Sequence, residues 1–329
     1  MIDVNRAEVR FLIEALRASS RLAATVQREM TANALSKDDR SPVTVGDFAV
    51  QAVVGALMEK ALPNDALVGE EDAGALREAE NAALLEQVTH FVKTEFPEAT
   101  PGAVCAWIDR GNAEPGSRFW TLDPIDGTKG FLRGEQYAAA LALIEGGKVT
   151  LGGLGCPNLV NGCEQAIGGT GSVIIAARGE GTWAAALDND SWSPLKVSAI
   201  ADPKDARVLR SVESGHTNVD QMDVVLERMG VEADPVRLDS QAKYGVLAGG
   251  KGDLLLRLLS ASKPDYKECI WDQAAGSIVI EEAGGRITDL SGKPLDFGQG
   301  RTLAKNAGVL ASNGPLHEAA LSALAESAP

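Results

Sequence analysis

Histidine, cysteine and aromatic residues are scarce in this chain. Among its 329 residues are 3 histidines and 4 cysteines, and aromatic residues make up 5%. The cysteines form no C-x-x-C pair and have no histidine nearby, which excludes a zinc knuckle or a redox motif. The histidines show no Ser-His or Cys-His spacing, so a covalent nucleophile is not indicated. We therefore expect reduced thiols and a cytoplasmic location.

Positively charged residues are also fewer than negatively charged ones. The chain has 31 Lys and Arg against 46 Asp and Glu, a formal net charge of −15. Such a surface repels phosphate backbones, so nucleic acid is not an expected partner. An anionic small molecule would need a local positive pocket or bound cations that invert the potential.

Long hydrophobic runs are absent as well. No apolar run approaches the roughly 20 residues that cross a bilayer. The first residues lack the basic-then-apolar layout of a signal peptide. We expect a soluble protein without a membrane partner, and we expect it to be a monomer.

The chain is longer than one typical core supports, so two domains are the starting expectation. Up to about residue 200 the pattern indicates helices and an antiparallel sheet, and beyond residue 201 strands and helices alternate. We predict an α+β domain over residues 1–200 and an α/β domain over residues 201–329. The expected elements of the first half are a helix over 4–30, a second helix capped by Asp47 and ending near 62, helical residues 73–96, a turn-rich stretch over 97–116, and hairpins over 137–154 and 173–186.

The sharpest motif is the run from Asp123 to Thr128, Asp-Pro-Ile-Asp-Gly-Thr, which directly follows a predicted strand. Two carboxylates at a strand end, with Pro124 fixing the turn, direct hard oxygen ligands to one place, and such ligands suit Mg²⁺. Gly127 and Thr128 then begin a helix whose free N–H groups can receive a phosphate. One short segment thus predicts both metal ligands and an anion site.

Other acidic residues lie at comparable positions along the chain. Glu70, Glu71 and Asp72 follow a predicted strand, and Asp272 precedes a predicted helix. Taken singly, the triplet is more often a solvated loop, and Asp47 or Asp272 is more often a helix cap. Taken together, acids at strand ends and helix starts predict a single tertiary site.

These segments resemble a known superfamily. Gly69-Glu70-Glu71, the Asp123–Thr128 run and Trp271-Asp272-Gln273-Ala274-Ala275-Gly276 are similar to the signature set of the inositol monophosphatase and fructose-1,6-bisphosphatase superfamily. The resemblance spans residues 43–289. It implies an inositol monophosphatase-like fold of alternating α-β-α-β-α layers, in which an α+β half is followed by an α/β half. It also implies hydrolysis of phosphomonoesters with more than one Mg²⁺ ion.

The resemblance further implies roles for particular residues. The metal ligands would be Glu70, Asp123, Asp126, Asp272 and the carbonyl of Ile125. Asp47 and Thr128, together with Glu70, would orient and deprotonate the attacking water. Paired divalent ions lower the pKa of a bound water and neutralise the leaving alkoxide, so this chemistry needs no covalent nucleophile.

Four further segments are similar to the plant and fungal 3′(2′),5′-bisphosphate nucleotidases. They are Lys37–Thr44, Lys129–Ala138, Ser211–His216 and Asp239–Tyr244. The resemblance implies removal of the 3′(2′)-phosphate from adenosine 3′(2′),5′-bisphosphate to give AMP, inhibition by Li⁺, and a role in sulfur metabolism. The sulfated nucleotide is a further candidate substrate. The residues implied to line the nucleotide pocket are His216, Ser240, Lys243 and Arg257.

Other interpretations stay open at this point. The retained 5′-phosphate would need a cation, and an Arg or Lys supplies one. Arg257 could nevertheless extend from a strand edge into solvent, and His216 could be a core histidine. An inositol or inositol polyphosphate phosphatase is an alternative, as is a non-catalytic sensor of the bisphosphate nucleotide. A sensor has little reason to keep a costly cluster of like charges. The sequence shows no obvious aromatic residue to stack on adenine.

Overall fold

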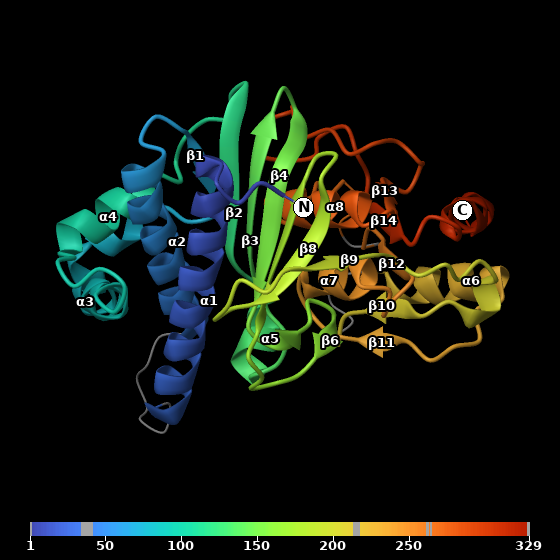
Figure 1. The fold of residues 1–329 in the computed structure, drawn as a ribbon, viewed down its shortest axis with the longest axis horizontal. Coiled ribbons are helices and arrows are strands. Elements are labelled where there is room, and N and C mark those ends of the chain that lie inside the picture. Colours follow the sequence, from blue (N-terminus) through green and yellow to red (C-terminus); the bar gives the residue numbers. More distant parts are fainter. Residues whose placement is uncertain (1, 34–41, 213–217, 261–262, 264, 328–329) are drawn as a thin grey trace.

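The structure is a computed structural model that describes residues 2–33, 42–212, 218–260, 263 and 265–327. Figure 1 shows five layers, in which two sheets alternate with three layers of helices. Helices α1 (Ala7–Asn33) and α2 (Pro42–Ala61) cover one face of the first sheet, and α3 (Ala82–Val92) and α4 (Pro101–Asp109) lie beyond α2. The apolar face of α1, which includes Val9, Leu12 and Leu16, is buried against the first sheet.

The first sheet has seven strands in the order β1-β2-β3-β4-β7-β8-β9. β1 is parallel to β2, and the other neighbours are antiparallel. Gly146 and Gly147, both with positive φ, form the tight turn between β3 and β4 that the sequence predicts. The strands are β1 (Leu67–Gly69), β2 (Arg118–Asp126), β3 (Ala138–Glu145), β4 (Lys148–Cys156), β7 (Ser172–Ala177), β8 (Gly181–Ala186) and β9 (Ser193–Leu195), and β5 (Leu159–Val160) pairs separately with β6 (Glu164–Gln165).

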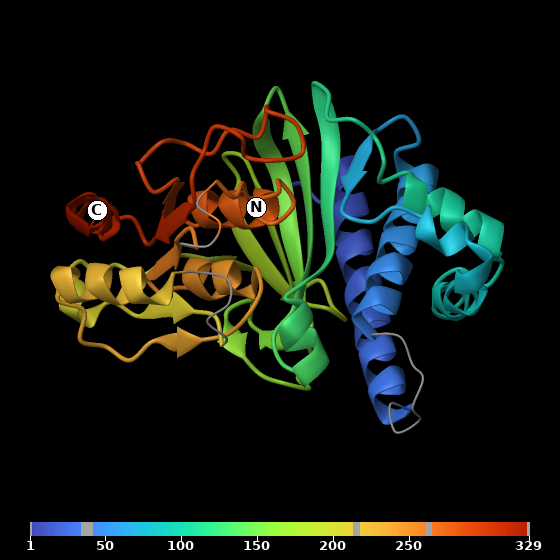
Figure 2. The same cartoon turned by 180° about the vertical axis from the view of Figure 1, so that it is seen from behind.

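The second sheet has five strands in the order β11-β10-β12-β14-β13. β10, β11 and β12 are parallel to one another, whereas β14 is antiparallel to its neighbours β12 and β13. These strands are β10 (Val208–Arg210), β11 (Val236–Arg237), β12 (Leu254–Arg257), β13 (Arg286–Thr288) and β14 (Val309–Ser312). Helices α7 (Ala242–Ala248) and α8 (Ala274–Glu282) lie between the two sheets, and α6 (Val219–Met229) and α9 (His317–Ser327) cover the outer face, as Figure 2 shows from behind.

The helix α8 is enclosed by both sheets. One buried apolar cluster contains Ile278 of α8, Leu154 and Ile174 of the first sheet, and Leu255 and Val309 of the second. Gly152 of β4 allows the close approach, because a Cβ there would lie 2.9 Å from Cγ2 of Ile278. The two halves of the chain therefore share a core.

The layer order confirms the predicted fold class, and three local expectations were wrong. The stretch over residues 97–116 contains α4, which begins with Pro101 in its first turn and is capped by the Thr100 side chain accepting from the Ala103 N–H at 3.2 Å. Helix α2 begins at Pro42, so Asp47 lies inside it and does not cap it. Residues 73–96 contain two short 3₁₀ turns (Ala75–Arg77 and Ala79–Asn81) before α3 begins. The division into two domains at residue 200 stays a prediction.

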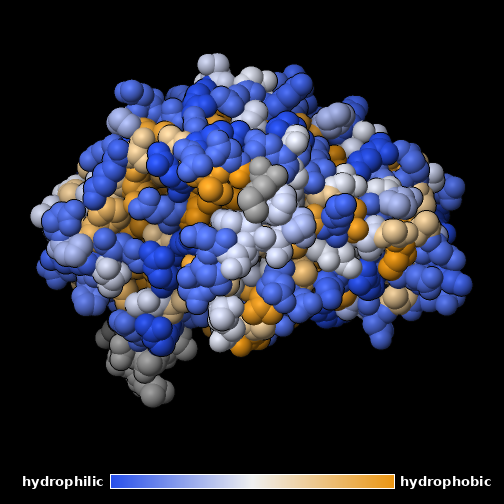
Figure 3. Space-filling model, viewed as in Figure 1, coloured by the Kyte–Doolittle hydropathy of each residue, from blue (hydrophilic) through white to orange (hydrophobic). Residues whose placement is uncertain are grey.

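The surface agrees with the charged composition. Figure 3 shows hydrophilic residues over most of one face, with apolar residues scattered among them. None of the helices in the described ranges is long and apolar enough to span a bilayer.

Candidate active site

A cavity of about 450 Å³ lies where the two halves of the chain meet. Strand β2, helix α5 (Thr128–Arg133), helix α7, the end of β12 and Ser211 directly after β10 contribute to its wall. Ten of the twelve residues that the sequence predicts for the site line it, namely Glu70, Asp123, Ile125, Asp126, Gly127, Thr128, Ser240, Lys243, Arg257 and Asp272. Asp47 does not line the cavity, and His216 lies outside the described residues.

Strand pairing brings three of the acids, Glu70, Asp123 and Asp126, to the same end of the first sheet. β1 and β2 are parallel neighbours, with Gly69 opposite Leu122, so Glu70 and Asp123 follow at the same end of the two strands. Residues three apart in a regular strand face opposite sides, which would separate Asp123 from Asp126. The pairing of β2 with β3 shifts between these two residues, an irregularity of the β-bulge kind. The shift allows both aspartates to line the cavity.

One wall of the cavity, called here the acidic wall, is formed by carboxylates whose negative charges are poorly compensated. Asp123 is only 3% exposed, and its Oδ1 has no hydrogen-bond partner among the residues that the structure describes. Burial raises the pKa of Asp123 well above its usual value, and the charges of Asp126, Glu70 and Asp272 raise it further. Desolvation raises the pKa of Glu70 to about 7 although its side chain reaches solvent, and Glu71 and Asp126 add to the effect. The pKa of Asp272 is also raised to about 7, chiefly by burial.

The chemistry of this wall suits hard divalent cations. Carboxylate and carbonyl oxygens are the ligands that Mg²⁺ and Ca²⁺ prefer, and the partnerless Oδ1 of Asp123 is available to a cation. Within the described residues, no three or more His, Cys, Asp or Glu side chains are gathered tightly enough to hold an ion as they stand. The donor types and their shared cavity therefore fit a metal site.

Asp47 and Thr128 approach this wall from different elements. Burial raises the pKa of Asp47, and the negative charges of Glu71 and Glu70 raise it further. Asp47 of α2 therefore lies near these acids. Thr128 is the exposed first residue of α5 and lines the cavity. No hydrogen bond between Asp47 and Thr128 is found within the described part of the chain.

Gly127 connects β2 to α5 under two constraints. Its φ of +89° is in the left-handed region that favours glycine. A Cβ at this position would lie 2.6 Å from the Cβ of Ser240, which also has a positive φ of 68°. The close contact lets the segment around Ser240 meet the end of β2.

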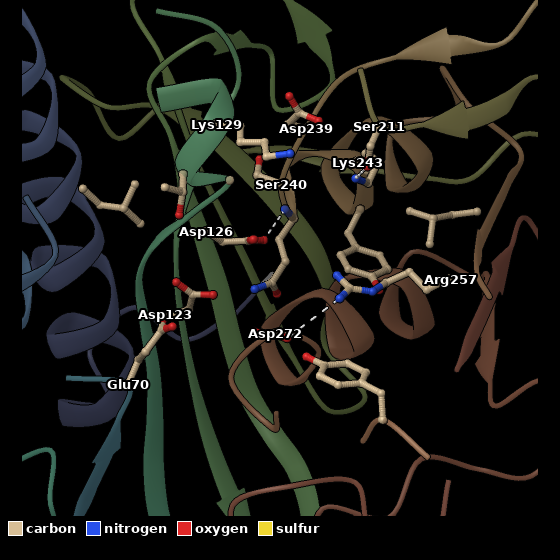
Figure 4. Close-up of a pocket in the computed structure, with 17 residues that line it drawn as sticks. Glu70, Asp123, Asp126, Lys129, Ser211, Asp239, Ser240, Lys243, Arg257 and Asp272 are labelled. Atoms are coloured by element: carbon tan, nitrogen blue, oxygen red, sulfur yellow. Dashed lines mark hydrogen bonds and ion pairs between the residues drawn. The ribbon is translucent and has the colours of Figure 1, made fainter. Parts of the chain in front are cut away.

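The opposite wall carries cations. Arg257 ends β12, and its Nη2 lies 2.7 Å from Oε2 of Glu268 and 3.9 Å from Oδ2 of Asp272. Its Nε donates to Oε1 of Glu268 at 3.3 Å, so the carboxylate of Glu268 holds the guanidinium at two points. Lys243 of α7 donates from Nζ to Oγ of Ser211 at 3.0 Å, and burial lowers the pKa of this lysine to about 8. Figure 4 shows these side chains across the cavity from Glu70 and Asp123.

Sequence reasoning missed several lining residues. The most informative is Tyr266, an aromatic side chain 41% exposed at the cavity, where no aromatic residue could be identified beforehand. A single tyrosine in a loop gives no periodic signal, and only its position six residues before Asp272 points to the site. The other lining residues that were not singled out are Lys129, Ser211, Asp239, Gln241, Tyr244 and Leu255.

Comparisons with known proteins agree with this architecture. The family model described as "Inositol monophosphatase family" matches residues 5–328. A Schizosaccharomyces pombe protein named "3'(2'),5'-bisphosphate nucleotidase" is 41% identical, over 97% of this chain and 95% of that protein. An Oryza sativa protein of the same name is 40% identical, over 97% and 93%.

Solved structures show the same fold. An inositol monophosphatase from Zymomonas mobilis has a TM-score of 0.64 at 18% identity, covering 99% of this chain and 100% of that one. An inositol monophosphatase from Anabaena has a TM-score of 0.63 at 19% identity, covering 97% and 96%. With a family model that matches nearly its whole length, the chain belongs to the inositol monophosphatase family.

Proposed function

We propose that this chain removes the 3′(2′)-phosphate from adenosine 3′(2′),5′-bisphosphate, giving AMP and inorganic phosphate. The observation that carries the proposal is one cavity with an acidic wall and a basic wall. The acidic wall suits the reacting phosphate with its metals, and the basic wall suits a second phosphate that does not react. The names of the relatives at about 40% identity support the same substrate.

The family is one of metal-dependent phosphatases, so a divalent metal is the cofactor. We assign Mg²⁺, with more than one ion, to Glu70, Asp123, Asp126, Asp272 and the carbonyl of Ile125. Bound divalent ions lower the pKa of a water molecule and neutralise the leaving oxygen. The protein's part is to bring these oxygens, from the ends of β1 and β2 and from the turn before α8, to one cavity.

The remaining residues take the substrate and the water. Asp47, Thr128 and Glu70 orient the attacking water, and the carboxylate of Asp47 accepts its proton. The N–H groups of Gly127 and Thr128 receive the reacting phosphate. Ser240, Lys243 and Arg257 bind the nucleotide at the opposite wall. The assignment of His216 to the nucleotide stays a prediction.

The experiment that tests the proposed function compares substrates. Release of inorganic phosphate is measured from adenosine 3′,5′-bisphosphate, the sulfated nucleotide phosphoadenosine phosphosulfate, and inositol 1-phosphate, each with Mg²⁺ and after chelation. We expect hydrolysis of the bisphosphate nucleotide that stops on chelation. A preference for inositol 1-phosphate would favour the inositol phosphatase. Tight binding of the nucleotide without turnover would favour the sensor.

Replacing the residues that orient water should affect turnover more than binding. We expect Thr128→Ala to lower kcat more than it raises KM, because water orientation matters chiefly in the transition state. Asp47→Asn should behave similarly. The double variant should be little worse than either single variant, because both act on one water. Steady-state kinetics check this, and additive losses would show that the two residues act separately.

Lithium should inhibit the enzyme at millimolar or lower concentration. Li⁺ and Mg²⁺ are similar in size, so Li⁺ can enter an oxygen site but supplies one charge where two are needed to compensate phosphate. Inhibition curves with LiCl, with KCl as the control for ionic strength, provide the measurement. Equal effects of the two salts would remove the assignment to a lithium-sensitive enzyme.

The cellular context follows the same proposal. The partner is a small phosphorylated molecule, and we propose that the chain acts as a monomer without nucleic acid. All four cysteines are free, in agreement with a cytoplasmic protein. Size-exclusion chromatography with light scattering measures the oligomeric state.

A further inference from the structure

Gln241 is a buried amide placed between the segments that carry the acids. It is 2% exposed and directly precedes α7. It lines the cavity, and sequence reasoning assigned it no role. Side-chain amides that are this deeply buried must satisfy their donors and acceptors within the protein. Its partners therefore show what it holds.

The hydrogen bonds of Gln241 reach two separate acidic segments. Its backbone N–H donates to Oδ2 of Asp126 at 2.5 Å. Its side-chain Nε2 donates to the carbonyl of Trp271, the residue before Asp272, at 3.0 Å. Its Oε1 accepts from the N–H of Gly276 in the first turn of α8 at 3.2 Å. One residue thus joins the end of β2 to the start of α8.

We infer that Gln241 is a positioning residue that sets the spacing between Asp126 and Asp272, and thereby the affinity for the divalent metal. Asp126 ends β2 and Asp272 lies in the turn before α8, and the mutual repulsion of the two carboxylates opposes a short separation. The backbone bond orients one carboxylate, and the amide fixes the loop that carries the other. This inference rests on the proposed metal ligands. Partners in the layer behind metal ligands commonly change metal affinity by about ten- to a hundredfold when removed.

A purely structural role would give a different result, and the chain offers a matched control. Asn313 is 1% exposed, and its side-chain amide donates to Oγ of Ser198 at 3.0 Å and to the carbonyl of Ile200 at 2.8 Å and accepts from the N–H of Leu316 at 3.3 Å. It follows β14 at the end opposite the cavity, where Ser312 pairs with Leu254, the first residue of β12. Replacing Asn313 should therefore lower stability without affecting the metal.

The test is a calorimetric titration of the full-length protein with Mg²⁺ alone, together with the melting temperature of the metal-free protein. The variants are Gln241→Met, which has similar length but cannot form either side-chain bond, Gln241→Asn, which is too short to span both partners, and Asn313→Leu. We expect both Gln241 variants to raise the Kd for Mg²⁺ by roughly ten- to a hundredfold. Asn313→Leu should lower the melting temperature and leave the Kd unchanged.

Three outcomes would overturn the inference. If the wild-type protein binds no Mg²⁺, the proposed metal ligands fail and the inference fails with them. If the wild type binds Mg²⁺ and the Gln241 variants bind it equally well, only the inference fails. If Asn313→Leu weakens Mg²⁺ binding as much, the effect is a general loss of stability. Should Gln241→Met not fold, Gln241→Asn decides between these outcomes.

Discussion

Asp123→Asn should lower kcat by at least about a hundredfold and, at the same time, stabilise the metal-free protein. The loss of activity follows from removing a charged metal ligand. The gain in stability follows because Asp123 is buried, has an oxygen without a partner, and faces other acids. A carboxyl group whose pKa is raised on folding destabilises the folded state at every pH above its pKa in the unfolded chain. Neutral pH is above that pKa. An uncharged isostere relieves that penalty by about 1–3 kcal/mol.

Asp289→Asn is the matched control for this experiment. Asp289 is 2% exposed, and its Oδ1 accepts from the N–H and Oγ of Ser291 and from the N–H of Lys293. Burial alone would raise the pKa of Asp289, but these hydrogen bonds hold it below its ordinary value. Its carboxylate therefore stabilises the fold at neutral pH and loses this effect as the pH falls, so the substitution should destabilise the protein.

Thermal unfolding with and without Mg²⁺ measures both effects. Mg²⁺ should raise the melting temperature of the wild type and of Asp289→Asn, because a ligand that binds only the folded state stabilises it. It should have little effect on Asp123→Asn. A variant at Asp123 that is destabilised without metal, or that remains fully active, would contradict the assignment.

Arg257→Ala should discriminate between two substrates of the same enzyme. Losing a charge-assisted contact to a phosphate costs ~1.5–3 kcal/mol, or roughly ten- to a hundredfold in kcat/KM. We expect that loss on adenosine 3′,5′-bisphosphate and little loss on adenosine 3′-monophosphate, which lacks the 5′-phosphate. Both substrates present the same leaving oxygen, so the ratio of the two kcat/KM values isolates the contact.

Arg257 also pairs with a buried carboxylate, and the pair of Arg207 with Asp253 provides a control for losing such a contact. Arg257 also compensates Glu268, so its removal leaves a buried carboxylate near Asp272. Arg207 is paired in the same way with buried Asp253, at 2.8 and 2.9 Å, at the other end of β12. Arg207→Ala should reduce stability with an equal change on both substrates. An equal loss on both substrates for Arg257→Ala would assign that residue to the fold or to the metal site.

The sequence predicted the chemistry-bearing segments because their signals are local. The run from Asp123 to Thr128 combines a strand end, a turn and a helix start within a few residues, and α5 begins at Thr128 as expected. The hairpin turn at Gly146 and Gly147 is local in the same sense. Resemblance to a family supplied the rest of the site, and the structure brings ten of the twelve predicted residues to one cavity.

Features that depend on distant partners could not be predicted in this way. The register shift that brings Asp123 and Asp126 to one side arises in the pairing of β2 with β3. The role of Gln241 depends on loops that lie far away in sequence. The missed helix α4 is a different case, because Thr100 and Pro101 form a local start signal that the surrounding glycines and prolines obscured.

The enclosure of α8 between the two sheets also limits how the molecule can move. Separating the halves would pull Ile278, which stays with Leu255 in the second half, away from Leu154 and Ile174 of the first sheet and expose apolar surface on both. A hinge-bending motion that opens the cavity by rotating one half as a rigid body is therefore disfavoured. Substrate entry and product release must instead depend on side chains and loops at the rim. The acids of the first sheet and Asp272, which directly precedes this helix, then stay in register throughout a turnover cycle, and heat should disrupt both halves in one cooperative transition.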